Sequence, residues 1–161
     1  MEKLEKIGFY PGSFDPFHEG HSYIVNMALD IFDKVIICIA INSDKTPFFP
    51  YKQREDIIKE IYKDNDRVEV VLCDGLVAMK ATELNATAII KGVRDEKDFG
   101  YEMKQADCNM FINHIPTVFI PSSPNFSFIS STLIRAIITG VKDKKKIHNM
   151  LLGIVNRKFY E

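Results

Sequence analysis

The sequence is poor in net charge, and this excludes several classes of protein. Its 161 residues contain 21 Lys and Arg against 22 Asp and Glu, which leaves a formal net charge of −1 at pH 7. A chain so nearly neutral lacks the global basic field that draws proteins to nucleic acids and to anionic membranes. We therefore expect no nucleic-acid partner, and any anionic ligand must be met by positive charge that is local.

Long hydrophobic runs are also missing. No apolar segment approaches the roughly 20 residues that a membrane-spanning helix requires. Residues 1–5 lead directly into a short apolar run, without the pattern of a signal peptide. The sequence has neither internal repeats nor low-complexity tracts, and its length suits one domain with a single core. We expect no leader segment and no membrane partner.

Cysteine is scarce and unpaired. The three cysteines, Cys38, Cys73 and Cys108, form no close C-x-x-C pair, and each lies in or beside an apolar run. This pattern predicts buried free thiols, which fit a reducing compartment and indicate a cytoplasmic protein.

Short apolar runs alternate with amphipathic ones along the chain. We predict strands at residues 6–10, 34–41, 67–72, 88–91 and 117–120. We predict helices at residues 21–32, 53–62, 76–84, 97–111, 131–138 and 145–159. The strict alternation predicts an α/β fold, a single doubly wound (Rossmann-like) domain over residues 1–161 with a five-stranded parallel sheet and helices on both faces. Such folds bind ligands where the strand order reverses, so the loops after the first and fourth strands are the places to search.

The loop after the first predicted strand carries the most informative motif. Residues 10–21 read YPGSFDPFHEGH and join that strand to a helix. A strand-to-helix junction of this kind binds phosphates, because the first N–H groups of a helix are free and its dipole is positive there. Ser13 adds a hydroxyl, while His18 and His21 are three apart and share a face. Gly20 between them leaves space for a bulky group. Two surface histidines in a plain loop would be the alternative, but the combination favours function.

The two histidines could also bind zinc. Helical zinc ligands more often lie four residues apart, and a third ligand is required. The remaining histidines, His114 and His148, are distant in the sequence. We expect no metal held by protein side chains alone.

The loop after the fourth predicted strand carries two cations around a glycine. Lys91 and Arg94 flank Gly92, and both can hold phosphate oxygens. Ordinary surface pairing with Asp95 or Glu96 is the alternative. The position at the expected reversal of strand order favours phosphate binding.

Two further loops carry candidate groups. Lys45 is a single cation on a loop limited by Pro47, where a merely solvated lysine is the alternative. Hydroxyl side chains precede the helix predicted at residues 131–138, where Ser130 or Ser131 should cap its N-terminus. The same N-terminus could bind a triphosphate.

These motifs together resemble the nucleotidylyltransferase superfamily, whose signature is HxGH. Residues 10–16 with residues 18–21 match that signature, and residues 129–131 with Arg135 match its Ile-Ser-Ser-x-x-x-Arg/Lys motif. The run DFGYE at residues 98–102 resembles one branch, the bacterial phosphopantetheine adenylyltransferases. The resemblance implies transfer of the adenylyl group of ATP to 4′-phosphopantetheine, giving dephospho-coenzyme A and pyrophosphate in the penultimate step of coenzyme A biosynthesis. It also implies a homohexamer, and Mg²⁺ bound mainly through the phosphates of ATP.

The same resemblance implies the roles of individual residues. Catalytic residues would be His21, Lys45 and Arg94. ATP would be bound by Ser13, Phe14, His21, Gly92, Val93, Arg94, Glu102, Phe126, Ser127, Phe128, Ile129, Ser130, Ser131 and Thr132. Phosphopantetheine would be bound by Ser13, Lys45, Val77 and Lys91. His18 has no settled role.

Three alternatives remain open. A cytidylyltransferase is the weaker enzymatic alternative, because members of that group usually carry an Arg-rich signature late in the chain. Nicotinate-mononucleotide adenylyltransferases share the Ser-Phe-Asp-Pro and HxGH elements, although the YPG opening, the short chain and residues 91–102 speak against them. A non-enzymatic nucleotide-binding module of flavodoxin-like type would not need two histidines beside its phosphate loop. Pyrophosphate release from ATP with each candidate acceptor discriminates among these functions.

Overall fold

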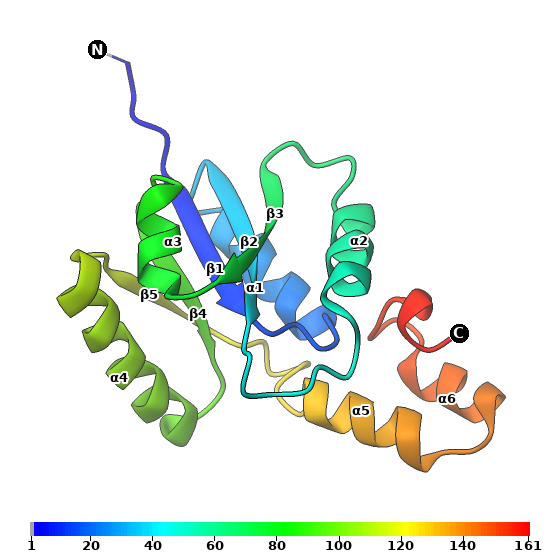
Figure 1. Ribbon diagram of the computed structural model, residues 1–161. Helices are drawn as coiled ribbons and strands as arrows, with labels where there is room; N and C mark the ends of the chain where they lie inside the picture. Colours follow the sequence, from blue (N-terminus) through cyan, green and yellow to red (C-terminus); the bar gives the residue numbers. More distant parts are fainter. Residues whose placement is uncertain (1) are drawn as a thin grey trace.

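Strands and helices alternate along the chain of the computed structural model, which describes residues 2–161 (Figure 1). The strands are β1 (Ile7–Gly12), β2 (Lys34–Ile41), β3 (Val68–Asp74), β4 (Ala88–Val93) and β5 (Thr117–Pro121). The helices are α1 (Glu19–Leu29), α2 (Tyr51–Ile61), α3 (Val77–Glu83), α4 (Glu96–Asn113), α5 (Ser131–Gly140), α6 (Lys144–Leu151) and the short 3₁₀ helix η1 (Arg157–Phe159).

The five strands form one parallel sheet in the order β3-β2-β1-β4-β5, which confirms the predicted doubly wound α/β fold. The order reverses between β1 and β4. These two strands pair only at Gly8 with Ala88 and at Phe9 with Ile89, so they separate towards their carboxyl ends. On its other edge, β1 stays paired with β2 along its whole length, from Ile7 to Gly12. The separation opens a crevice where the rule for doubly wound sheets expects the ligand.

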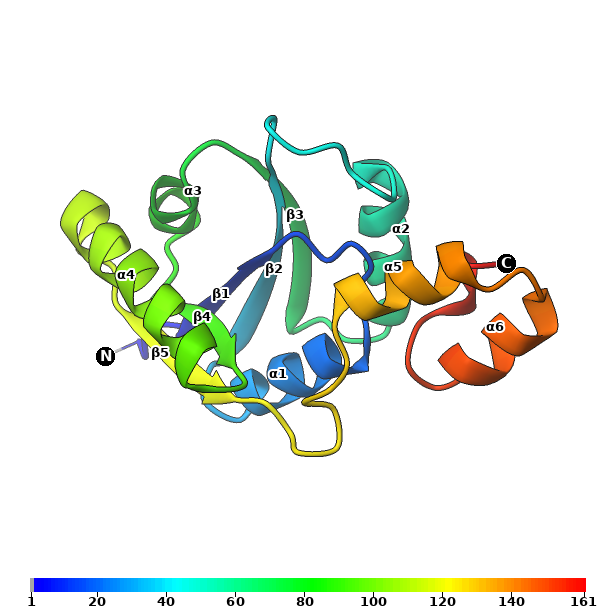
Figure 2. The same ribbon diagram turned by 90° about the horizontal axis from the view of Figure 1, so that it is seen from below.

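Apolar layers cover both faces of the sheet. On one face α1 and α2 bury Ile24, Val25 and Ile58 against strand residues such as Ile37 and Ile90. On the other face α3 buries Ala78 and Ala81 against Phe9, Ile36 and Cys38. Figure 2 shows α3 and α4 on one side of the sheet and α1 and α2 on the other. Strands buried on both faces need continuous apolar runs, which is why the sequence pattern located them.

The predicted final helix at residues 145–159 is too long. Helix α6 begins at Lys144 but ends at Leu151, and Gly153 then takes a left-handed φ of 75°. The chain turns back towards α1, where Val155 forms an antiparallel bridge with His18 and the Ile154 carbonyl accepts the Glu19 N–H at 2.8 Å. Helix α1 therefore begins at Glu19, two residues before the predicted start.

The prediction of three buried thiols is wrong for one of them. Cys38 and Cys73 are buried, whereas Cys108 is exposed on α4, a helix with no buried residue. Phe99 of α4 packs edge-on against Phe119 of β5, with ring centroids 5.1 Å apart, whereas Tyr101 and Phe111 of the same helix are exposed. No helix described between residues 2 and 161 is both long and apolar enough to cross a membrane.

Gly8 provides a test of how closely β1 packs. A Cβ placed there would lie 2.5 Å from Ile90 Cδ1 and 2.8 Å from Phe32 Cδ2. We expect Gly8→Ala to lower the free energy of unfolding by about 1–3 kcal/mol, because overpacking displaces core side chains. Gly140→Ala is the matched control, since a Cβ there meets nothing within 4 Å. Urea unfolding measures both variants, and an equal effect of the two substitutions would contradict this account.

Candidate active site

A cavity of about 460 Å³ opens at the carboxyl ends of β1 and β4, where the strand order reverses. It gathers residues that the sequence placed on four separate loops. The predicted site residues that line it are Ser13, Phe14, His21, Lys45, Lys91, Gly92, Arg94, Glu102, Phe126, Ile129, Ser130, Ser131 and Thr132. All three candidate catalytic side chains therefore face one space.

Four predicted site residues lie outside the cavity lining, namely Val77, Val93, Ser127 and Phe128. Val77 packs against the apolar core under α3, which is a structural role. Phe128 is 67% exposed, and the Ser127 hydroxyl donates to the Pro124 carbonyl at 3.2 Å. Their assignment as ligand contacts stays a prediction.

The two histidines form a stacked pair at the start of α1. Their ring centroids are 3.7 Å apart. His18 caps the helix, because its Nδ1 accepts the Gly20 N–H at 3.1 Å, while the His18 N–H donates to Nδ1 of His21 at 3.1 Å. A Cβ on Gly20 would lie 2.9 Å from His18 Cε1, so the bulky group that this glycine accommodates is the His18 ring. Nδ1 of His21 is thus an acceptor, and the proton of the neutral ring lies on Nε2.

Both imidazoles are held in the neutral form. Burial lowers the pKa of His18 to about 4, and the Arg94 charge adds to the effect. The pKa of His21 also lies well below its usual value because of burial, with His18 and Arg94 contributing. Near pH 7, His21 is therefore an uncharged hydrogen-bond donor through Nε2, while the cations of the site come from lysine and arginine.

The cations after β4 pair with carboxylates of α4. Lys91 Nζ lies 3.2 Å from Glu102 Oε2, and Arg94 Nε lies 3.9 Å from Asp98 Oδ2. The sequence alternative of pairing with Asp95 or Glu96 is wrong, because Asp95 instead caps α4 by accepting the Asp98 N–H at 2.8 Å. Lys45 is in none of the salt bridges found within residues 2–161.

Hydrogen bonds of Asp15 and Arg54 hold the phosphate-loop candidate, residues 13–16, in place. The Asp15 carboxylate accepts the backbone N–H groups of Phe48 and Phe49, each at 2.8 Å. Arg54 on α2 is 1% exposed, and its Nη1 donates to the Ser13 carbonyl. This anchor joins the Ser13 loop to the segment that follows Lys45.

Helix α5 is joined to the same loop. Ser131 Oγ donates to the Pro16 carbonyl at 2.9 Å, and Arg135 Nη1 donates to the Asp15 carbonyl at 2.8 Å. Ser130 is the N-cap, since its Oγ accepts the Leu133 N–H at 3.1 Å. The N-terminus of α5 thus faces the cavity from a fixed position, with positive dipole and free N–H groups towards it.

Sequence reasoning missed some contributors. The cavity is also lined by Tyr10, Ile24, Asp98 and Ser122. Arg54 supports the cavity wall through its hydrogen bond to the Ser13 carbonyl. Asp98 follows Arg94 by four residues and could have been found by that helical spacing. Ser122 follows β5 at the sheet edge that carries the other site residues. Arg54 shares the buried face of α2 with Ile57 and Ile58, an unusual place for a charge.

Comparisons with known proteins agree with this geometry. The cytidylyltransferase-like family matches residues 9–137. A phosphopantetheine adenylyltransferase from Francisella tularensis subsp. novicida (strain U112) is 43% identical over 135 residues, which cover 83% of this chain and 83% of the relative.

Solved structures show the same fold at low sequence identity. A bifunctional NMN adenylyltransferase/ADP ribose pyrophosphatase from Francisella tularensis aligns with a TM-score of 0.61 at 19% identity, covering 88% of this chain and 44% of that one. The nicotinic acid mononucleotide adenylyltransferase of Plasmodium falciparum, complexed with NaAD, aligns with a TM-score of 0.60 at 16% identity, covering 98% and 93%. These two likenesses concern the fold alone.

Burial of His18 predicts a pH dependence of stability. The pKa of His18 is about 4 in the folded protein and 6.5 for an ordinary exposed histidine, so the unfolded state binds more protons between these two pH values. The free energy of unfolding is therefore insensitive to this group above pH 6.5. It falls by up to about 3 kcal/mol as the pH falls towards 4, because protons bind preferentially to the unfolded state. His18→Asn keeps a side chain able to cap a helix and should flatten part of this slope. Urea unfolding at pH 7 and pH 4.5 measures the effect, and identical slopes for both proteins would refute it.

Proposed function

Because this chain belongs to the cytidylyltransferase-like family and, within it, to the phosphopantetheine adenylyltransferases, we propose that it transfers the adenylyl group of ATP to 4′-phosphopantetheine. The products are dephospho-coenzyme A and pyrophosphate, in the penultimate step of coenzyme A biosynthesis. The observation that carries the proposal is the meeting of His21 from α1, Lys45 from the segment after β2 and Arg94 from the segment after β4 in one cavity at the reversal of strand order.

The proposed reaction needs no protein base. A phosphate oxygen of phosphopantetheine attacks the α-phosphorus of ATP, a new P–O bond forms, and the bond to the β-phosphate breaks to release pyrophosphate. A phosphate dianion is already a competent nucleophile, so catalysis rests on alignment and on stabilising charge. His21 suits this task as a neutral donor, because its Nε2–H can bind an α-phosphate oxygen as negative charge grows there.

The cations divide between the two substrates. Lys45 and Lys91, with Ser13, would hold the acceptor phosphate, while Arg94 and the N-terminus of α5 would hold the triphosphate. The cavity volume of about 460 Å³ lies within the usual range for ligand sites of about 300–1,000 Å³. Charges brought to one place by separate rigid loops align the reacting groups at little cost in entropy.

We propose that Mg²⁺ arrives on the phosphates of ATP. Residues 2–161 bring together no group of three His, Cys, Asp or Glu side chains able to hold a metal ion. Magnesium commonly binds substrate phosphates with one or two carboxylates and keeps several waters. When bound, it would neutralise phosphate charge beside the groups named above.

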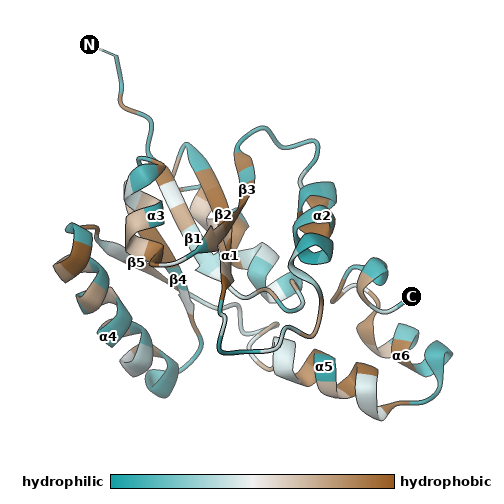
Figure 3. Cartoon of the chain, viewed as in Figure 1, coloured by the Kyte–Doolittle hydropathy of each residue, from teal (hydrophilic) through white to brown (hydrophobic). Residues whose placement is uncertain are grey.

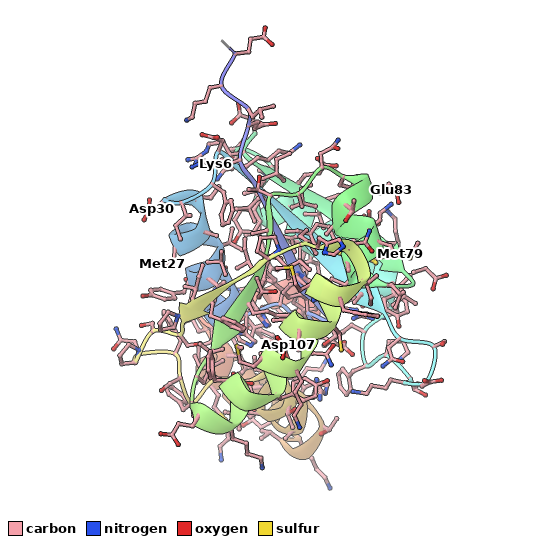
Figure 4. All side chains as sticks on the ribbon, turned by 90° about the vertical axis from the view of Figure 1, so that its left-hand side faces the viewer. Lys6, Met27, Asp30, Met79, Glu83 and Asp107 are labelled. Atoms are coloured by element: carbon pink, nitrogen blue, oxygen red, sulfur yellow. The ribbon has the colours of Figure 1, made fainter. Side chains whose placement is uncertain are left out.

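We also propose that the enzyme is a cytoplasmic homohexamer. Helix α4 has no buried residue in the described chain, and its side chains include Tyr101 at 64% and Phe111 at 87% exposure. Figure 3 shows a hydrophobic outer end of α4, and Figure 4 shows α4, with Asp107 labelled, lying uncovered over one face of the sheet. A face of this kind is typical of a surface that another copy covers. The two buried free thiols fit a reducing compartment. Light scattering should give six times the chain mass of 18.5 kDa, and a monomer mass would refute the hexamer.

Nicotinate mononucleotide is the alternative acceptor, because the fold is shared with adenylyltransferases of nicotinate and nicotinamide mononucleotides. Purified protein should release pyrophosphate from ATP with 4′-phosphopantetheine and not with nicotinate mononucleotide. Turnover with nicotinate mononucleotide alone would reverse the assignment, and turnover with neither would end the enzymatic proposal.

The same assay tests His21. Loss of one positioned donor costs about 2.7–4 kcal/mol in the barrier, so His21→Ala should lower kcat by about 10²–10³ while ATP still binds. His148→Ala is the matched control, because that histidine lies on α6 outside the cavity lining. Near-normal turnover of a folded His21→Ala protein would remove His21 from the mechanism.

A further inference from the structure

Glu102 places a negative charge inside a cavity built for anions. Its Oε2 lies 3.2 Å from Lys91 Nζ, and the two side chains are only 16% and 22% exposed. Both residues line the cavity, so the pair stands where substrate phosphates are expected. An acidic side chain in this place weakens the attraction of the site for phosphate. Its presence in the cavity therefore suggests a role other than binding phosphate.

The contact is electrostatic and poorly hydrogen-bonded. Glu102 Oε2 is buried, and among residues 2–161 it has no hydrogen-bond partner of acceptable geometry. A buried carboxylate oxygen without a good donor has unused capacity to accept a hydrogen bond. Glu102 is therefore able to exchange Lys91 for a better donor when one enters the cavity.

The neighbouring pair shows that α4 presents two such carboxylates. Asp98 lies four residues before Glu102, so both project from one face of α4. Asp98 is tied more firmly, because it also accepts the Arg94 backbone N–H at 3.1 Å. Within residues 2–161, Glu102 Oε2 accepts no such hydrogen bond, and the Lys91 ammonium is its partner.

Lys91 cannot meet a phosphate dianion independently of Glu102. The carboxylate oxygen is 3.2 Å from the same ammonium group, so a phosphate on Lys91 would lie close to a like charge. Repulsion between partly buried like charges is strong, because the surroundings screen it less than water does. The resting ion pair thus competes with the acceptor phosphate.

We propose that Glu102 is a competing counter-ion of Lys91 that couples the two substrate sites. A nucleotide in the cavity that offers Glu102 a hydrogen-bond donor draws the carboxylate away from Lys91, so ATP raises the affinity for the acceptor phosphate. Thermodynamic linkage then requires that the acceptor raise the affinity for ATP by the same factor. This inference rests on the proposed function, because it takes ATP and phosphopantetheine as the ligands.

Calorimetric titration tests the coupling directly. Wild type should bind 4′-phosphopantetheine about fivefold or more tightly in the presence of a non-hydrolysable ATP analogue. Glu102→Gln should bind phosphopantetheine about fivefold more tightly without nucleotide, bind the analogue more weakly, and lose the coupling. Opposite changes for the two ligands would not follow from a general loss of structure.

Two further variants isolate the ion pair. Glu83→Gln is the matched control, since Glu83 (labelled in Figure 4) pairs with Lys80 at 3.1 Å on α3, outside the cavity lining. It should leave both affinities unchanged. In a Lys91→Met background, the gain from Glu102→Gln should disappear. If Glu102→Gln still raised the affinity for phosphopantetheine in this background, Glu102 would act by repelling the ligand phosphate directly. That result would overturn its role as a counter-ion of Lys91.

The outcomes separate this inference from the proposed function. Unchanged or weaker phosphopantetheine binding by Glu102→Gln, in a protein that still forms dephospho-coenzyme A, would overturn the coupling alone. Failure of the wild type to bind phosphopantetheine would overturn the proposed function and, with it, the role of Glu102.

Discussion

The candidate site depends on the bond network around the Asp15 carboxylate. The carboxylate accepts two backbone N–H groups of the segment after Lys45, and the backbone carbonyl of Asp15 accepts a hydrogen bond from Arg135 of α5. Buried Arg54 lies beside it and holds the Ser13 carbonyl. Three loops that approach from different strands are thereby fixed to one point. The network thereby fixes the Ser13 loop, the segment that follows Lys45 and the N-terminus of α5 relative to one another.

Two kinds of positive potential meet in the cavity, and only one of them carries formal charge. His21 contributes as a neutral dipole, because burial and nearby charge lower its pKa. Lysine and arginine contribute full charges, which α4 partly cancels through Asp98 and Glu102. A site arranged in this way remains able to attract anions while the resting protein avoids a cluster of unpaired cations.

The sequence was sufficient for the sheet and for the position of the site. Strands such as β2 are buried on both faces, so local composition identifies them, and topology then places the crevice between β1 and β4. It was insufficient where a distant segment decides the local structure. The last predicted helix looked continuous because Leu151, Val155 and Phe159 have helical spacing, yet these residues pack around a turn at Gly153. The burial of Arg54 likewise depends on a carbonyl that is far away in the chain.

The bridge between Val155 and His18 also bears on how the protein is made. The histidine motif leaves the ribosome early, but the backbone that receives the first N–H of α1 belongs to Ile154 and is synthesised much later. A nascent chain can carry every residue of the motif while the histidines still lack their final support. The N-terminus of α1 therefore gains this backbone partner only after residues 154 and 155 have been translated.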